Sequence, residues 1–124
     1  MATITYKVTV ATGTNKYGTG NKYYINGEAN VVLYLQEGNT YIFDTSDSTN
    51  DTHVFAFSTN PNNSPAAPYT TGVTTTGVSG QAGSNTTIVV APVKTTGAPL
   101  LFYYCTFHLK TNIDYLFQLQ NLYL

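Results

Sequence analysis

The sequence ITYKVTV, residues 4–10, decides the fold class, because apolar and polar side chains alternate along its whole length. A two-residue period is typical of a β-strand that buries one face. The alternation returns at residues 31–36, and apolar runs at residues 86–91 and 100–105 predict further strands. Asn26-Gly27 between two such segments is a favoured tight-turn pair. About eight short strands at this spacing predict an all-β sandwich.

The composition favours one small β-domain. The chain has 124 residues, of which 42% are hydrophobic, with eleven Tyr and six Phe. That length suffices for one sandwich core but not for two. Charged residues make up only 9%, against about 25% in an average soluble domain. We therefore expect a single domain over residues 1–124 whose surface consists mainly of Thr, Asn, Ser and Gly.

The charge pattern excludes several partners. Five Lys and no Arg give a net charge of −1, so the clustered cations that nucleic-acid binding needs are missing. No apolar run approaches the roughly 18 residues of a membrane span. The N-terminal residues lead directly into the first predicted strand, so we expect no secretory leader. We expect neither a nucleic-acid partner nor a membrane partner.

Four further segments carry structural expectations. Residues 12–21, rich in Gly, Asn and Thr, predict a loop, and His53 to Ser58 predicts a strand that His53 begins. Residues 60–69 contain three prolines and predict a surface excursion. Residues 113–124 show both an alternating and a helical pattern. We expect an extended C-terminal strand there, which either closes the sandwich or docks on a neighbouring subunit.

One constellation carries chemistry. Cys105-Thr106-Phe107-His108 ends an aromatic strand, and His53 lies about fifty residues earlier. One thiolate and two imidazoles are the ligand set of a mononuclear copper site of the blue type. The alternative is structural, because Cys is often fully buried and a histidine at a strand start is often only hydrogen-bonded. A Cys-His hydrolase lacks an evident orienting acid and an oxyanion loop.

These residues resemble the cupredoxin family. The chain is most similar to short cupredoxin-like modules of structural and hypothetical proteins of marine bacteriophages. The resemblance runs from about Val8 to His108, and four segments carry it: VTVATGTNKYGTGNKYYIN (8–26), EGNTYIFDTSD (37–47), YTTGVTTTGVSGQAGS (69–84) and YYCTFH (103–108).

The resemblance implies a cupredoxin-like Greek-key β-sandwich with His53, Cys105 and His108 as the copper ligands. Copper-loaded relatives usually add an axial Met soon after the second His. Here residues 109–112 read LKTN and the only Met is Met1. We therefore expect no cofactor, and copper stays open as the alternative.

Other polar features predict less. Asp44, Asp47, Asn50 and Asp51 form an oxygen-rich stretch, but its spacing is not that of an EF-hand, so we interpret it as a solvated turn and not as a calcium site. Matches to the glycosylation acceptor begin at Asn50, Asn62 and Asn85, and such matches arise by chance in an Asn- and Thr-rich chain. Tyrosines such as Tyr23, Tyr24, Tyr34 and Tyr41 favour strand packing over a sugar platform.

Three function classes remain. We expect a non-enzymatic structural protein of a phage virion surface, either a capsid decoration (cement) protein or a tail-associated sandwich. It would be made in the host cytoplasm and would bind other virion proteins, of the capsid or tail, and copies of itself as a homo-oligomer. The alternatives are a small type 1-like copper electron-transfer protein, which would normally need export, and a glycan-binding adhesin. The predicted interface consists of Ile113, Tyr115, Leu116, Phe117, Leu119, Leu122, Tyr123 and Leu124.

Overall fold

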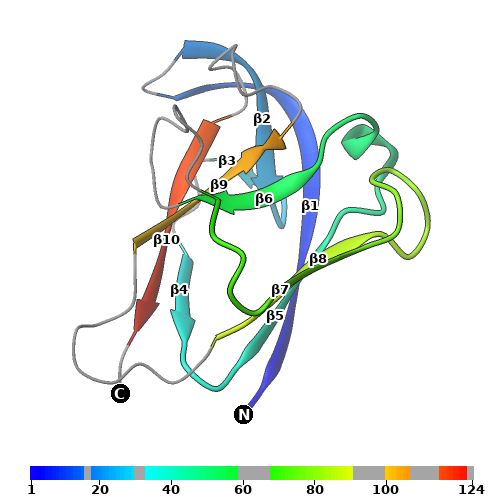
Figure 1. Cartoon of the computed structure of the whole chain (residues 1–124). Coiled ribbons are helices and arrows are strands. Elements are labelled where there is room, and N and C mark those ends of the chain that lie inside the picture. The colour runs from blue at the N-terminus through cyan, green and yellow to red at the C-terminus, as the bar shows by residue number, and fades with distance from the viewer. Residues whose placement is uncertain (16–17, 30–32, 59–67, 91–99, 107–114, 123–124) are drawn as a thin grey trace.

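Two β-sheets make up the fold (Figure 1). The computed structural model describes residues 1–15, 18–29, 33–58, 68–90, 100–106 and 115–122. The strands are β1 (Thr3–Asn15), β2 (Gly18–Ile25), β3 (Glu28–Ala29), β4 (Leu33–Gln36), β5 (Thr40–Asp44), β6 (Phe55–Ser58), β7 (Val73–Thr76), β8 (Asn85–Val89), β9 (Leu100–Cys105) and β10 (Tyr115–Leu122). A short 3-10 turn, η1 (Ser48–Asn50), lies between β5 and β6. The all-β sandwich predicted from the sequence is confirmed.

The chain crosses repeatedly between the two layers. The larger sheet has six strands in the order β3-β2-β1-β5-β8-β7, and the smaller has four in the order β4-β10-β9-β6. Neighbours are antiparallel except for β1 beside β5 and β4 beside β10. From β4 to β7 each strand lies in the opposite sheet from the one before. No helix in the described segments is long and apolar enough to cross a membrane.

The first hairpin is longer than predicted. Residues 12–21 were expected to form a loop, but β1 and β2 remain paired as far as Asn15 opposite Gly18. Threonine is β-branched and suits a pleated strand, and the hydroxyls of Thr14 and Thr19 form a cross-strand hydrogen bond of 2.9 Å. The loop prediction was wrong because the glycines of this segment pair across the ribbon instead of turning it.

The turn at Asn26-Gly27 forms as predicted. Both residues have positive φ angles, 51° and 82°, which is the backbone that a two-residue hairpin turn needs. The side chain of Asn26 also accepts a hydrogen bond of 2.8 Å from the Lys7 N–H. The turn therefore connects β2 to β3 and is also hydrogen-bonded to β1.

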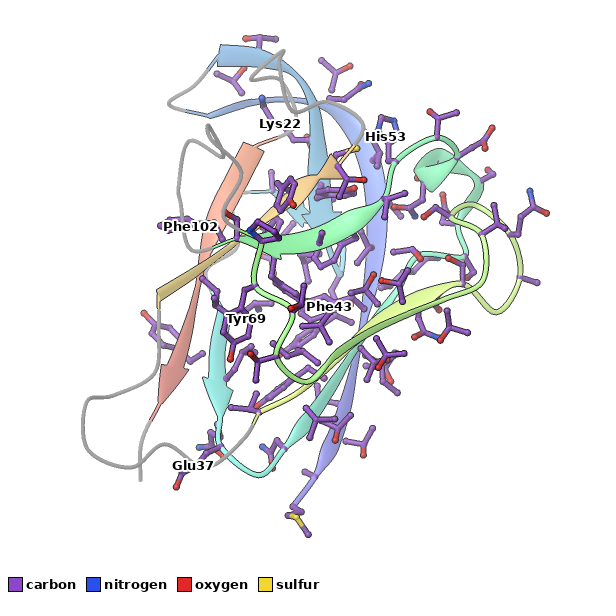
Figure 2. The ribbon with its side chains drawn as sticks, viewed as in Figure 1. Lys22, Glu37, Phe43, His53, Tyr69 and Phe102 are labelled. Carbon is purple, nitrogen blue, oxygen red and sulfur yellow. The ribbon has the colours of Figure 1, made fainter. Side chains whose placement is uncertain are left out.

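Aromatic rings hold the sheets together. Phe43 on β5 stacks on Phe55 on β6, with ring centroids 4.9 Å apart, and Phe55 stacks in turn on Tyr103 on β9 at 5.3 Å. All three rings are almost fully buried, and Figure 2 shows Phe43 within the body of the molecule. Such pairs add about 0.5 to 1.5 kcal/mol each to the burial of their area. This stack connects the larger sheet to the smaller one.

The C-terminal segment is a strand and not a helix. β10 pairs in parallel with β4 and antiparallel with β9, so that Leu119 lies opposite both Leu33 and Leu101. The strand therefore lies within the smaller sheet, between β4 and β9. Of the residues predicted as an interface, Ile113, Tyr123 and Leu124 lie outside the described residues. The structure gives the backbone pairing of Tyr115, Leu119 and Leu122, and the register shifts between Tyr115 and Gln118. The interface itself stays a prediction.

Candidate functional site

His53 follows η1 and precedes β6. Its backbone N–H donates to the Asn50 carbonyl at 2.8 Å, and Thr52 before it has a left-handed backbone with φ of 67°. The prediction that His53 begins a strand was therefore slightly wrong, because β6 starts at Phe55. The tight turn places the His53 side chain against the protein, where it is 7% exposed.

The 3-10 turn that positions His53 is attached to β1. The Asp47 carboxylate accepts hydrogen bonds from the backbone N–H and the hydroxyl of Thr49, at 2.9 and 2.7 Å. These two bonds lower the pKa of Asp47. The Thr49 hydroxyl in turn accepts from the Val10 N–H at 2.9 Å, and the fully buried Asn50 amide donates to the Val8 carbonyl at 2.8 Å. Sequence reasoning missed this role of Asn50, because an Asn in a polar stretch carries no sign of burial.

Cys105 is the last residue of β9. Its Cα lies opposite that of Phe55 in the antiparallel pairing of β6 and β9. The pairing continues for one more bond, from the Thr106 N–H to the Val54 carbonyl at 3.0 Å. Cys105 is 2% exposed, and it belongs to the hydrophobic core cluster. The register of these two strands therefore brings Cys105 next to the residues that follow His53.

Two of the three predicted ligands, His53 and Cys105, lie next to each other. Cys105 Sγ lies 3.5 Å from Nδ1 of His53, and both side chains are buried. This distance fits a hydrogen bond between sulfur and nitrogen. It also fits two ligands of one metal ion, which at bond lengths of about 2.0 to 2.3 Å in tetrahedral or trigonal geometry lie about 3.5 to 3.8 Å apart. Burial and then the adjacent Cys105 raise the pKa of the Tyr104 phenol, so Tyr104 stays neutral at ordinary pH.

The third predicted ligand, His108, lies outside the described residues. Across the described part of the chain, no group of three or more His, Cys, Asp or Glu residues could hold a metal ion. The donors present, a thiol sulfur and an imidazole nitrogen, are those that copper and zinc prefer. The described geometry therefore supplies two members of the predicted ligand set and leaves His108 as a prediction.

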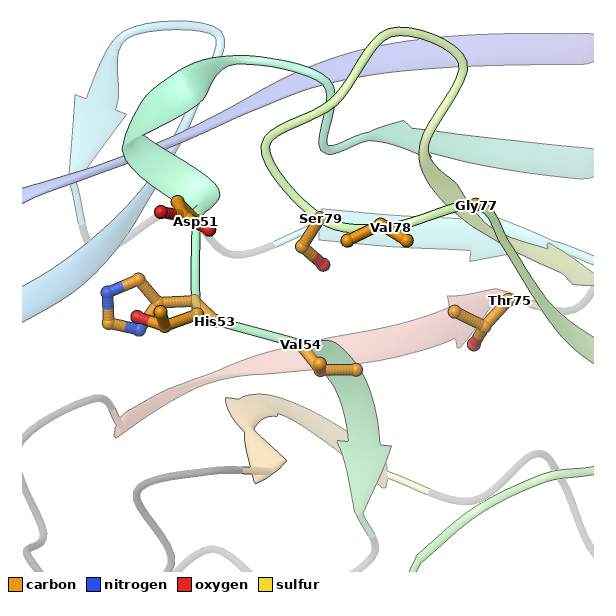
Figure 3. Close-up of a pocket in the computed structure, with 8 residues that line it drawn as sticks. Asp51, His53, Val54, Thr75, Gly77, Val78 and Ser79 are labelled. Carbon is orange, nitrogen blue, oxygen red and sulfur yellow. The ribbon is translucent and has the colours of Figure 1, made fainter.

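A cavity of about 310 Å³ opens beside His53. It is lined by residues 51–54 on one side and, on the other, by Thr75 of β7 and the turn that follows β7 (Figure 3). Figure 3 shows the His53 ring lying away from Thr75. Among the residues at its wall are the exposed Asp51 and Val78, the latter 68% exposed. His53 therefore forms part of the wall of this cavity.

The acidic stretch is structural. Asp47 caps η1, and the Asp44 carboxylate accepts from the Ser46 N–H at 2.9 Å. These two carboxylates therefore bind backbone N–H groups of their own turn. Asn50 is fully buried, so it is no glycosylation acceptor in the folded chain.

The tyrosines are divided between core and surface. Tyr23 and Tyr41 lie in the hydrophobic core, whereas Tyr34 on β4 is 54% exposed. The named tyrosines therefore do not form one exposed platform.

Lys22 is a feature that the sequence analysis did not anticipate. Lysine is almost never fully buried, yet Lys22 on β2 is 1% exposed (Figure 2). Its neighbour Tyr23 is 2% exposed, so two consecutive residues of one strand are both covered. A period-two pattern gives no signal for this, because it assigns one of any two neighbours to solvent.

Neither a protein-family model nor a curated protein matches this chain. The resemblance to cupredoxin-like phage modules therefore rests on the sequence segments that carry it.

Proposed function

We propose that this chain is a non-enzymatic structural protein of a phage virion surface, either a capsid decoration protein or a tail-associated sandwich, and that it works by assembly. The observation that carries the proposal is the surface of residues 70–84, which is largely exposed and contains no charged side chain. Charges are costly to strip of water and are depleted at the centre of protein interfaces. A neutral Thr- and Gly-rich surface therefore suits close packing against neighbouring virion proteins. The resemblance to phage structural modules supports the same role.

Particle incorporation tests this role. Phage particles purified from infected cells should contain the chain in many copies, measured by quantitative mass spectrometry. Thr71→Lys with Gln81→Lys puts two charges on the neutral surface, since both residues are exposed. This variant should lower the occupancy several-fold, while Thr12→Lys, at an exposed position of β1, should leave it unchanged. A folded wild type that is absent from purified particles would overturn the proposal.

A second candidate function is copper binding of type 1 character, and the 3.5 Å separation of Cys105 Sγ and His53 Nδ1 favours it. Such a site needs a third ligand, for which the sequence provides His108. Protein purified without chelator would then carry copper and show an intense visible absorption from the thiolate. Cys105→Ser should abolish that absorption, and the control Thr106→Ser should keep it. A metal-free, colourless protein that stays colourless after addition of Cu²⁺ excludes this candidate.

A further inference from the structure

The outer edge of β6 is covered by the protein itself. Its Phe57 carbonyl accepts a hydrogen bond of 2.9 Å from the Tyr69 N–H. Its Phe55 carbonyl accepts one of 2.9 Å from the Thr86 hydroxyl, which reaches across from β8. Both bonds satisfy backbone groups that β9 cannot reach. The edge of the smaller sheet at β6 is therefore closed to a further strand.

The remaining edges differ from one another. On β4 the Gln36 N–H donates to the Tyr41 hydroxyl at 2.8 Å, and β3 has only two residues. β7 has four, and Thr74, Thr75 and Thr76 are all exposed. Natural edge strands usually avoid pairing with another chain by means of Lys, Pro or a bulge. β7 has neither residue type, and its pairing with β8 runs without a register shift.

The register shows which backbone groups of β7 point outward. The Val89 N–H donates to the Gly72 carbonyl at 2.9 Å, which makes residues 72 and 89 a hydrogen-bonded pair. Such pairs alternate along an antiparallel ladder, so Thr74 and Thr76 bond to β8 while the backbone groups of Val73 and Thr75 point away from it. The Val73 N–H is used locally, by the Thr70 carbonyl at 3.0 Å.

The outward groups that remain are the Val73 carbonyl, both groups of Thr75 and the N–H of Gly77. These groups point away from β8. None of them has a hydrogen bond to another described residue. They form a short row of donors and acceptors on an exposed strand.

We propose that this edge joins two copies of the chain through an antiparallel pairing of β7 with β7, centred on Thr75. Each Thr75 N–H then donates to the Thr75 carbonyl of the other copy. Each Gly77 N–H donates to the Val73 carbonyl of the other copy. The outward N–H that is already bonded, that of Val73, is not needed. This pairing would supply a contact between copies of the chain in the proposed assembly. The dimer itself does not depend on the proposed function, and only its role in the particle does.

A second copy fits this edge better than a strand of different sequence because the edge is complementary to itself. Centring on Thr75 places Thr74 of one copy opposite Thr76 of the other, on the solvent face, and Thr-Thr pairs across strands are favourable. No charged residue lies within residues 70–84, so this segment brings no like charges of its own together across a two-fold axis. Val78, 68% exposed just beyond Gly77, adds apolar area at the same edge.

Thr75→Pro tests the pairing, with the self-association of the purified full chain measured by analytical ultracentrifugation over a concentration series. Proline removes the outward N–H and no bond to β8, and edge strands tolerate proline in that orientation. Wild type should form dimers, and Thr75→Pro should weaken dimerisation about tenfold or more, because two hydrogen bonds are lost. Thr75→Ser keeps the N–H and should dimerise as wild type does. A wild type that is monomeric throughout, or an undiminished Thr75→Pro dimer, would overturn the proposal.

Charge pairs on the solvent face give a test that does not depend on proline. Thr74→Lys with Thr76→Lys places lysines opposite lysines and should prevent dimerisation, and the corresponding double glutamate variant should behave likewise. An equimolar mixture of the two should form a heterodimer with two Lys-Glu pairs. Failure of the mixture to associate would contradict the register. A monomeric wild type that still enters particles would overturn the pairing and leave the assembly role intact, whereas a dimer absent from particles would do the reverse.

Discussion

Cys105 Sγ lies 3.5 Å from His53 Nδ1 although the two residues are 52 positions apart in the chain. The contact depends on the pairing of β6 with β9, which sets Phe55 opposite Cys105, and on the 3-10 turn that leads into His53. Both residues are buried, so the contact is part of the packed interior as well as a candidate for metal binding. A structural role for the pair requires no bound metal, because the contact and the burial are already present in the folded chain.

The first prediction concerns the stability of that contact. Cys105→Ser places a more polar group at a position that is 2% exposed, which should lower the free energy of unfolding by about 1 to 3 kcal/mol. Urea unfolding followed by circular dichroism measures the change. Thr106→Ser at the neighbouring position should change it by less than about 0.5 kcal/mol. Equal stability of Cys105→Ser and wild type would show that Cys105 contributes nothing to the core.

The second prediction concerns the bond between the sheets. Thr86→Val removes the hydroxyl that donates to the Phe55 carbonyl and leaves a buried acceptor unsatisfied. The free energy of unfolding should fall by about 1 to 3 kcal/mol. Thr74→Val, the same substitution at an exposed position of the adjacent strand, is the matched control and should be nearly neutral. If both variants lose the same stability, the cross-sheet hydrogen bond does not stabilise the fold.

The third prediction is a pH dependence. Hydrogen bonds from Thr49 hold the pKa of Asp47 below its usual value of 3.8, so the folded state binds this proton less readily than the unfolded state does. The corresponding stability is present above that value and is lost as the pH falls below it. Asp47→Asn should therefore flatten the loss of stability on acidification below about pH 4. An unaltered acid limb in Asp47→Asn would contradict the capping role.

The fourth prediction concerns β10. A chain that ends after Asn112 lacks the strand that lies between β4 and β9, so the smaller sheet is divided. The loss should exceed several kcal/mol, because each large apolar side chain of that segment that is buried contributes about 1.5 to 3 kcal/mol. We expect no cooperative thermal unfolding of this chain. The control ends after Leu122 and keeps the whole strand, and a wild-type transition in the shorter chain would show that β10 is dispensable.

The sequence predicts those elements whose pattern is local. Leu100–Cys105 forms a strand with the predicted bounds, and the Asn26-Gly27 turn forms as its residue types require. Residues 12–21 were misjudged, because Gly and Asn favour turns locally and only the pairing of two long strands keeps them extended. The burial of Lys22 and Asn50 was missed for the same reason, since it depends on elements far away in the chain.

The candidate site could likewise be predicted only in part from the sequence. The residue types of His53 and Cys105 indicated a shared site, whereas their separation follows from strand register, which residue type does not determine. The open edge of β7 was also beyond sequence reasoning, because its outward backbone groups are identified only by their position relative to β8.

The central claim, that this protein works by assembly and not by turnover, is tested most directly by counting copies of Cys105→Ser and of wild type in purified phage particles. The substitution removes the thiolate that metal chemistry would need, but it leaves the neutral surface of residues 70–84 unchanged. We expect equal copy numbers for the two proteins whenever the variant is folded. A folded Cys105→Ser protein that is missing from the particles, or a wild type that carries stoichiometric copper and exchanges electrons with a partner, would contradict it.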